Sequence, residues 1–193
     1  LARQFLGMVI LREGDLHVEF LIHILTDDLL LEAGDKLMGT QHQGVILRLA
    51  AVEGLAEGAA EAKCARPLLI AVTQLTSTSA EMLRDELLIG TPMEETVAHY
   101  AANAAQSGLD GVVCSPHEAA AVKRANGQGF LTVTPGIRFA DGSADDQVRI
   151  MTPEKARATG TDYIVVGRAV TAAADPQGAY LRCLEAFTGG MNL

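Results

Sequence analysis

The sequence lacks the features that mark membrane, disulfide-rich and metal-binding proteins. No apolar run approaches the roughly 20 residues that a membrane-spanning helix needs, and the run from Phe5 to Leu11 is too short for a secretory signal and has no cleavage-site pattern. The three cysteines, Cys64, Cys114 and Cys183, are far apart and odd in number, so they give neither a metal-ligand spacing nor a disulfide framework. We therefore expect no metal, no membrane partner, and buried free thiols in a cytoplasmic protein.

Positive charge is also scarce. The 193 residues include 15 Lys and Arg against 24 Asp and Glu, a formal net charge of −9, which argues against nucleic acid or an anionic membrane as partner. A small anionic substrate is still possible, because two or three local arginines are enough to bind one. The apolar fraction of 49% and the 19 glycines suit a single α/β enzyme domain over residues 1–193. Since the chain begins with Leu1 rather than methionine, we expect it not to be a complete gene product.

From residue 66 onward, short apolar runs alternate with helical patterns. The runs are β-branched and bounded by polar residues or glycine, which predicts buried parallel strands at 67–73, 111–114, 130–134 and 163–166. Helical spacing and capping residues predict helices beginning at Ser77 or Ser79, at Pro92, at Ser115-Pro116, at Pro153 and at Pro176.

Four strand-and-helix units in the C-terminal part equal half of a TIM (β/α)8 barrel or most of a doubly wound sheet. A doubly wound dinucleotide-binding sheet would carry G-x-G-x-x-G after its first strand, and none occurs there. The pattern therefore favours the barrel. Residues 1–65 fit poorly: strands at 5–11 and 17–25 and helices at 27–37 and 45–55 give only about two units, so the N-terminal part of the barrel is incomplete or misread.

Glycine and arginine follow the last two predicted strands. Gly136 and Arg138 come after the strand at 130–134, and Gly167 and Arg168 come after the strand at 163–166. Neighbouring parallel strands would present these residues side by side, and the short segment 167–171 has room for an extra helix there. Glycine lets backbone N–H groups approach an anion, and a guanidinium binds its oxygens in pairs. The pattern predicts a phosphate site.

Five motifs in order resemble orotidine 5′-phosphate decarboxylase of the bacterial type over residues 51–187. They are Ile70-Ala-Val-Thr-Gln-Leu-Thr-Ser-Thr78, Ser107-Gly-Leu-Asp-Gly-Val-Val-Cys114, Thr134-Pro-Gly-Ile-Arg138, Asp145-Asp-Gln-Val-Arg149 and Ile164-Val-Val-Gly-Arg168. The resemblance implies decarboxylation of orotidine 5′-monophosphate to UMP and CO2 in pyrimidine biosynthesis. It also implies a pyrimidine nucleoside monophosphate as ligand, no metal or organic cofactor, and a homodimer.

The same resemblance implies roles for individual residues. Arg138 and Arg168, with the N–H of Gly167, would bind the 5′-phosphate. Thr76, with Ser77 beside it, would bind the pyrimidine edge. Gln147, on the loop after the seventh barrel strand, would bridge the phosphate and the base, because an amide can donate to one group and accept from another. Arg149 and Arg157 are expected to be solvated. Of the two, Arg149 is the better candidate for an indirect role, in which it supports residues that contact the ligand.

The catalytic half departs from the family. Its Asp-x-Lys-x-x-Asp motif aligns best with Val18–Thr26, where Leu21 stands for the lysine, and Glu19 and Ile24 stand for the two aspartates. Leucine cannot deliver a proton to the carbon that loses CO2. Three explanations stay open: residues 1–65 are not the true sequence, the chain is a degenerate homologue, or it is a chimera.

Two other functions therefore compete with the decarboxylase. One is a non-catalytic pseudoenzyme that binds a nucleotide, and the other is a related phosphate-sugar decarboxylase or synthase. The segment Thr73–Ser77 argues against the latter, because a pyrimidine-binding segment has no use for a sugar substrate.

Overall fold

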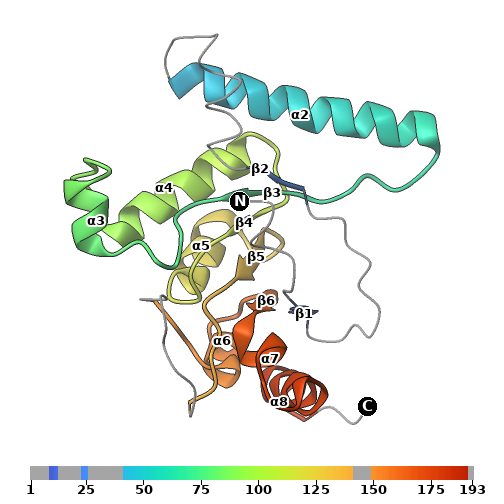
Figure 1. The fold of residues 1–193 in the computed structure, drawn as a ribbon. Helices are drawn as coiled ribbons and strands as arrows, with labels where there is room; N and C mark the ends of the chain where they lie inside the picture. The colour runs from blue at the N-terminus through green and yellow to red at the C-terminus, as the bar shows by residue number, and fades with distance from the viewer. Residues whose placement is uncertain (1–8, 13–22, 26–40, 141–148, 191–193) are drawn as a thin grey trace.

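The computed structural model describes residues 9–12, 23–25, 41–140 and 149–190. Their strands form one six-stranded sheet in the order β1-β6-β5-β4-β3-β2 (Figure 1). The strands are β1 (Val9–Arg12), β2 (His23–Leu25), β3 (Leu69–Val72), β4 (Gly111–Val113), β5 (Leu131–Thr134) and β6 (Tyr163–Val166). The last four coincide with the strands predicted from the sequence, which are confirmed.

Strands β2 to β6 are parallel, and β1 is not. Ile70 pairs with Gly111, Val112 with Thr132, and Thr134 with Ile164, while β1 runs antiparallel to β6. Strand β2 falls inside the predicted range 17–25, and β1 extends one residue past the end of the predicted range 5–11. The antiparallel β1 does not continue the parallel β-α order of the C-terminal part.

Helices connect the parallel strands. They are α2 (Gln41–Ala62), α3 (Ala80–Asp85), α4 (Met93–Gln106), α5 (Ala119–Asn126), α6 (Pro153–Ala158), α7 (Arg168–Thr171) and α8 (Pro176–Thr188). Ser79 caps α3, and its side chain accepts from the N–H of Met82. The expected short helix after β6 is present as α7. The predicted helix at 27–37 lies outside the described residues.

One helix start was predicted wrongly. Ser115 was expected to cap a helix beginning at Pro116, but α5 begins at Ala119, and Glu118 occupies its N-cap. The reason is a turn over residues 115–118. The N–H of Ser115 donates to Glu118 Oε2 at 2.8 Å and the N–H of His117 donates to Ser115 Oγ at 3.3 Å. These bonds close a loop before the helix can begin.

The alternation of side chains along each strand produces two apolar layers. On one face, Leu69 and Val112 pack with α4 and α5, and Ile164 and Val166 pack with α6 and α8. On the other face a third cluster contains the alternate strand residues, which are Ile70, Val113, Val133, Tyr163 and Val165. Buried side chains on both faces are what a barrel strand requires, because it packs against helices outside and against other strands inside.

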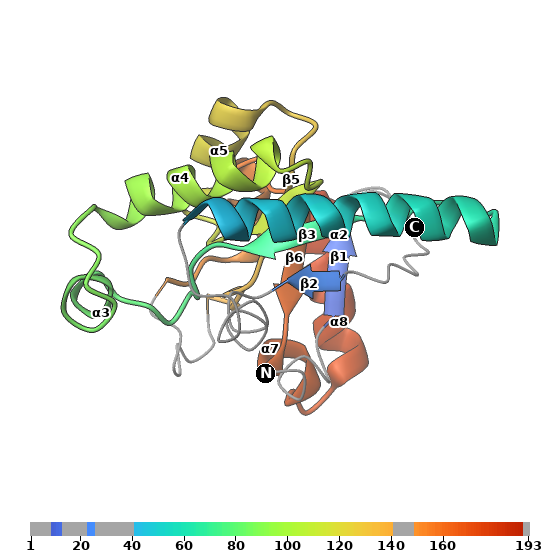
Figure 2. The same cartoon turned by 90° about the horizontal axis from the view of Figure 1, so that it is seen from above.

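Helix α2 is longer than the predicted helix 45–55. It crosses above β2 and β3, and its C-terminal half extends beyond the sheet in both views (Figures 1 and 2). Of the side chains that the structure describes in α2, Val52 and Leu55 pack against the cluster of α4 and α5, and Ala59 is buried.

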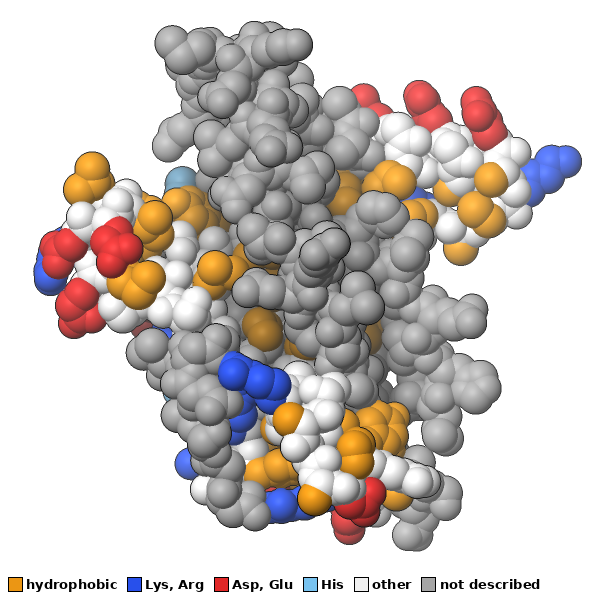
Figure 3. Space-filling view, in the orientation of Figure 1, with side chains coloured by type: hydrophobic (Ala, Val, Ile, Leu, Met, Phe, Trp, Pro, Cys, Tyr) orange, Lys and Arg blue, Asp and Glu red, His pale blue; other side chains and the backbone are white. Residues whose placement is uncertain are grey.

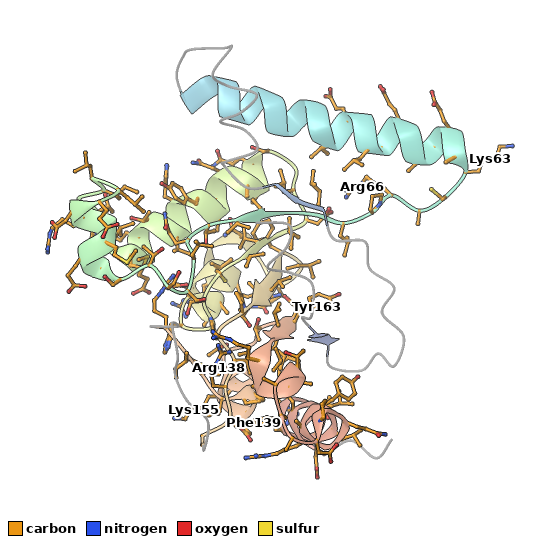
Figure 4. The ribbon with its side chains drawn as sticks, viewed as in Figure 1. Lys63, Arg66, Arg138, Phe139, Lys155 and Tyr163 are labelled. Atoms are coloured by element: carbon orange, nitrogen blue, oxygen red, sulfur yellow. The ribbon has the colours of Figure 1, made fainter. Side chains whose placement is uncertain are left out.

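Two aspartates fix the N-terminal ends of the strands. Asp110, just before β4, accepts from the N–H of Leu69 at 2.7 Å and pairs with Arg66 (Figure 4). Asp162, just before β6, accepts from the N–H of Thr132 at 2.7 Å and pairs with Lys123. Each carboxylate thus ties the start of its own strand to the preceding parallel strand.

Two further predictions concern thiols and membranes. Cys114 and Cys183 are buried free thiols as predicted, but Cys64 is exposed, because it follows the end of α2 and packs against no core element. Burial raises the pKa of Cys183 to about 12, and it raises the pKa of Cys114 as well. In the described part of the chain, no helix is long and apolar enough to cross a membrane.

Candidate functional site

The candidate site lies at the C-terminal ends of the parallel strands. The chain turns there after β3 at Thr76, after β4 at Glu118, after β5 at Gly136 and Arg138, and after β6 at Gly167. Thr73 fixes the first of these turns, because both its N–H and its hydroxyl donate to the carbonyl of Val113 on β4, at 3.1 and 2.9 Å. Parallel strands end on one edge, so loops far apart in sequence gather there.

The register of β5 and β6 places the two predicted phosphate arginines at equivalent positions. Thr134 pairs directly with Ile164, and Arg138 and Arg168 each lie four residues beyond these partners in the sequence (134 to 138, 164 to 168). Because the two strands are parallel, both segments leave the sheet at the same edge, and this brings the two arginines to the same end of the sheet.

Gly136 brings the ends of β3 and β5 into contact. Its φ is +86°, a conformation that glycine adopts readily and other residues rarely do. A Cβ atom placed on Gly136 would lie 2.8 Å from the carbonyl oxygen of Arg149 and 3.4 Å from Thr76 Cγ2. Only a residue without a side chain lets the loop after β5 pass this close to the predicted base-binding Thr76.

Arg138 is buried beside this contact. Its residue is 8% exposed, its N–H donates to the carbonyl of Met151 at 3.1 Å, and Nη1 donates to the carbonyl of Ile137 at 2.8 Å. The buried Nε has no hydrogen-bond partner in the described structure. Phe139, which follows it, packs into the cluster with α6 and α8, and the Arg182 guanidinium lies 4.2 Å from the centroid of its ring (Figure 4). The backbone on both sides of Arg138 is therefore fixed.

Gly167 and Arg168 form the start of α7. Gly167 is the N-cap residue, and its carbonyl accepts from the N–H groups of Val170 and Thr171 at 2.9 and 3.0 Å. Arg168 is exposed, in contrast to Arg138. Basic side chains are visible on the part of the surface where α6 and α7 lie, whereas acidic side chains line α2 (Figure 3). Basic side chains thus gather on this face although the chain as a whole is acidic.

Arg149 was expected to be solvated, and the structure contradicts this. Its side chain is only 14% exposed and forms an ion pair with Glu118 through Nη1. Nη2 donates to the carbonyl of Leu75 at 2.8 Å. Burial raises the pKa of Glu118, while Arg149 and the N–H of Ser115 oppose that rise. No local pattern indicates this pair, because its members are 31 residues apart on different loops.

The structure places some of the predicted site residues and not others. Thr76 is buried, Ser77 beside it is half-buried, and Ile24 pairs with Ile70 through the backbone of β2. Gln147, Glu19 and Leu21 lie outside the described residues. The structure therefore brings Thr76 and the Gly136–Arg138 loop together, and the catalytic positions stay predictions. Within the described ranges, no three His, Cys, Asp or Glu side chains are arranged to bind a metal ion.

Comparison with known proteins gives matches over the same C-terminal region. A sequence model of the orotidine 5′-phosphate decarboxylase / HUMPS family matches residues 45–183. The orotidine 5′-phosphate decarboxylase of Bacillus caldolyticus is 62% identical over 141 residues, which are 73% of this chain and 57% of that protein. The chain thus spans less than two thirds of the length of this relative.

Two solved structures are similar to the chain. An uncharacterized conserved protein from Geobacillus kaustophilus matches with a TM-score of 0.58 and 50% identity over 72% of this chain and 57% of its own. Orotidine 5′-phosphate decarboxylase from Lactobacillus acidophilus matches with a TM-score of 0.54 and 43% identity over 64% of this chain and 50% of its own. Together with the alternating parallel strands and helices, these matches confirm the predicted fold class, the TIM barrel.

Proposed function

The chain belongs to the orotidine 5′-phosphate decarboxylase / HUMPS family, and on this premise we propose that it binds a pyrimidine nucleoside monophosphate at the C-terminal edge of its sheet. The activity of the protein is then the decarboxylation of orotidine 5′-monophosphate to UMP and CO2 in pyrimidine biosynthesis. Eight relatives that carry this name are 52–62% identical to the chain over the region that they share with it.

The observation that supports the proposal best is the state of Arg138. Burying a guanidinium with Nε unpaired is costly unless something compensates for the lost hydration. Nε of Arg138 has no partner in the described structure, and the backbone around it is fixed at the strand ends. A phosphate oxygen would supply the missing acceptor and the opposite charge, and an arginine fork binds such oxygens in pairs.

The other proposed contacts use residues of the same edge and, for Gln147, which lies outside the described residues, the family resemblance. Arg168 and the N–H of Gly167 bind the phosphate from the end of β6, opposite Arg138 at the end of β5. Thr76 and Ser77 bind the pyrimidine edge, and Gly136 keeps Thr76 close to the phosphate loop. Gln147 bridges the two parts of the ligand. A ligand with both a base and a phosphate uses all of these residues, whereas a sugar phosphate would leave Thr76 and Ser77 without a role.

The decarboxylation step needs an acid that this chain does not show at the aligned position. Loss of CO2 leaves an electron pair on the ring carbon, and a nearby protonated lysine would deliver a proton to it. Leu21 has no proton to give. This residue favours the second candidate, a homologue that binds the nucleotide without turning it over.

The assembly and location of the protein belong to the same proposal. As in the family it resembles, we expect a homodimer that works in the cytoplasm without a metal or an organic cofactor. Size-exclusion chromatography with light scattering measures the molecular mass of the assembly. A mass near 20 kDa, that of one chain, would contradict the homodimer.

Two measurements on the purified protein separate the candidates. UMP should raise the melting temperature, because a ligand that binds only the folded state stabilises it, and ribulose 5-phosphate should do so much less. A sugar phosphate that stabilises more than UMP would contradict the nucleotide site. Release of CO2 from orotidine 5′-monophosphate then distinguishes enzyme from pseudoenzyme. Peptide mass spectrometry across residues 1–66 establishes in the same sample whether position 21 is leucine or lysine.

A further inference from the structure

The segment 149–151 lies between the two loops that carry the base-binding and phosphate-binding residues. The N–H of Arg149 donates to the carbonyl of Thr76 at 3.2 Å. Two residues on, Met151 forms a parallel bridge with Ile137: its N–H donates to the carbonyl of Gly136 at 3.1 Å, and its carbonyl accepts from the N–H of Arg138 at 3.1 Å. One short segment is therefore hydrogen-bonded to the loop after β3 and to the loop after β5.

The side chain of Arg149 adds a third loop to this connection. Nη1 pairs with Glu118 after β4, and Nη2 donates to the carbonyl of Leu75 after β3. Glu118 is itself held, because its other oxygen accepts from the N–H of Ser115 at 2.8 Å. The guanidinium thus fixes the position of Leu75 and Thr76 relative to the loop after β4.

The pair is built for rigidity rather than for surface charge. Glu118 is 6% and Arg149 14% exposed by side chain, so solvent screens their attraction little. A buried ion pair seldom adds much net stability over apolar residues, but removing one partner leaves a buried charge without compensation. The cost of separation therefore holds both groups, and the loops that carry them, in one arrangement.

We propose that Arg149, held by Glu118, is a positioning residue that sets the distance between the base-binding Thr76 and the phosphate-binding Arg138. Both Nη atoms of Arg149 are already engaged by Glu118 and Leu75, so its role in this proposal is exerted through the backbone of residues 75–76 and 136–138. Its buried Nε, like that of Arg138, has no hydrogen-bond partner among the described residues. The inference rests on the proposed nucleotide site. Its consequence is that Arg149 affects binding of the whole nucleotide more than binding of the phosphate end alone.

The experiment compares UMP with ribose 5-phosphate, which has the phosphate and sugar but no base. Dissociation constants are measured by calorimetry for the wild-type protein and for Arg149→Met, which keeps an unbranched apolar stem but removes the guanidinium and its charge. We expect the Kd of UMP to rise on the order of tenfold, since residues that couple two sites typically change the coupling by this much. The Kd of ribose 5-phosphate should change by less than about twofold.

Three further variants make the result specific. Arg124→Met removes the same charge from an exposed position near the end of α5 and should leave both constants unchanged. Arg149→Lys keeps the charge without the planar fork and should give an intermediate loss for UMP. Glu118→Gln is nearly isosteric and, like Arg149→Met, should raise the Kd of UMP. It also serves if Arg149→Met does not fold, which circular dichroism and thermal melting will show.

The outcomes separate the inference from the proposed function. Equal losses for UMP and ribose 5-phosphate, or no loss for UMP in Arg149→Met and Glu118→Gln, would overturn the positioning role while the nucleotide site stands. A wild-type protein that does not bind UMP would overturn the proposed function, and the inference with it. A loss confined to UMP, partly rescued by lysine, supports both, because a merely structural role would not change the ratio of the two constants.

Discussion

Replacing Arg138 by alanine should weaken UMP binding more than any other single change at the phosphate end. Alanine removes the guanidinium and leaves the backbone bond from the N–H of residue 138 to the carbonyl of Met151, which any residue other than proline can make. The loop after β5 should therefore keep its path. What is lost is the charge-assisted contact that we propose between Arg138 and the phosphate.

The size of the effect follows from the burial of Arg138. A hydrogen bond to a charged group contributes about 1.5–3 kcal/mol, and with Arg138 only 8% exposed the upper part of this range applies, because water screens the contact little. At 1.4 kcal/mol for each factor of ten, the whole range corresponds to roughly a ten- to a hundredfold rise in the Kd of UMP, and its upper part to roughly a fifty- to a hundredfold rise. Arg168 is exposed, so Arg168→Ala should raise the Kd of UMP by about tenfold or less.

Titration calorimetry with UMP, together with thermal melting of each free variant, measures both effects. Arg138→Lys keeps a charge but not the paired donors, and its Kd should lie between those of the wild type and Arg138→Ala. A Kd within about twofold of the wild type for Arg138→Ala, in a variant that still folds, would refute the assignment of Arg138. The same result for Arg168→Ala would remove Arg168 from the phosphate site.

The remaining predictions concern stability and reactivity. Gly136→Ala should lower the free energy of unfolding by roughly 1–3 kcal/mol and weaken UMP, because φ is positive and the added Cβ meets a carbonyl oxygen. The matched control Gly160→Ala also has a positive φ but open space around it, so a cost equal to that of Gly136→Ala in urea denaturation would contradict the steric argument. Asp162→Asn should cost about 3 kcal/mol, because it leaves the buried Lys123 without its counter-charge; an unchanged urea midpoint would show that the pair is unimportant. A maleimide should label Cys64 alone in the folded protein and all three thiols in denaturant; rapid labelling of a second thiol in the folded state would show that the core opens.

Local patterns in the sequence were enough to predict the C-terminal half of the fold. The runs at 111–114 and 163–166 are short, apolar and bounded by turn residues, and they became β4 and β6. Pro176 with Asp175 before it marked the start of α8, where the Asp175 side chain accepts from the N–H of Gly178. Signals of this kind act over a few residues, so they can be read without knowing what the chain packs against.

The start of α5 shows where local signals fail. Ser115-Pro116 is a good helix start by composition, yet the Glu118 carboxylate binds the N–H of Ser115 and closes a turn first. Glu118 adopts this position while it also pairs with Arg149, a partner that no local pattern could indicate. The antiparallel pairing of β1 with β6 is a long-range choice of the same kind.

The sequence by itself determined the order of strands and helices, the glycine–arginine ends of β5 and β6, and the family, because each of these depends on residue types at fixed spacing. Only the tertiary structure decided that Arg138 is buried while Arg168 is exposed. It alone placed Gly136 against Thr76 and paired Arg149 with Glu118. Burial and pairing arise from contacts between loops that are far apart in the chain and meet only when the parallel strands bring their ends to one edge.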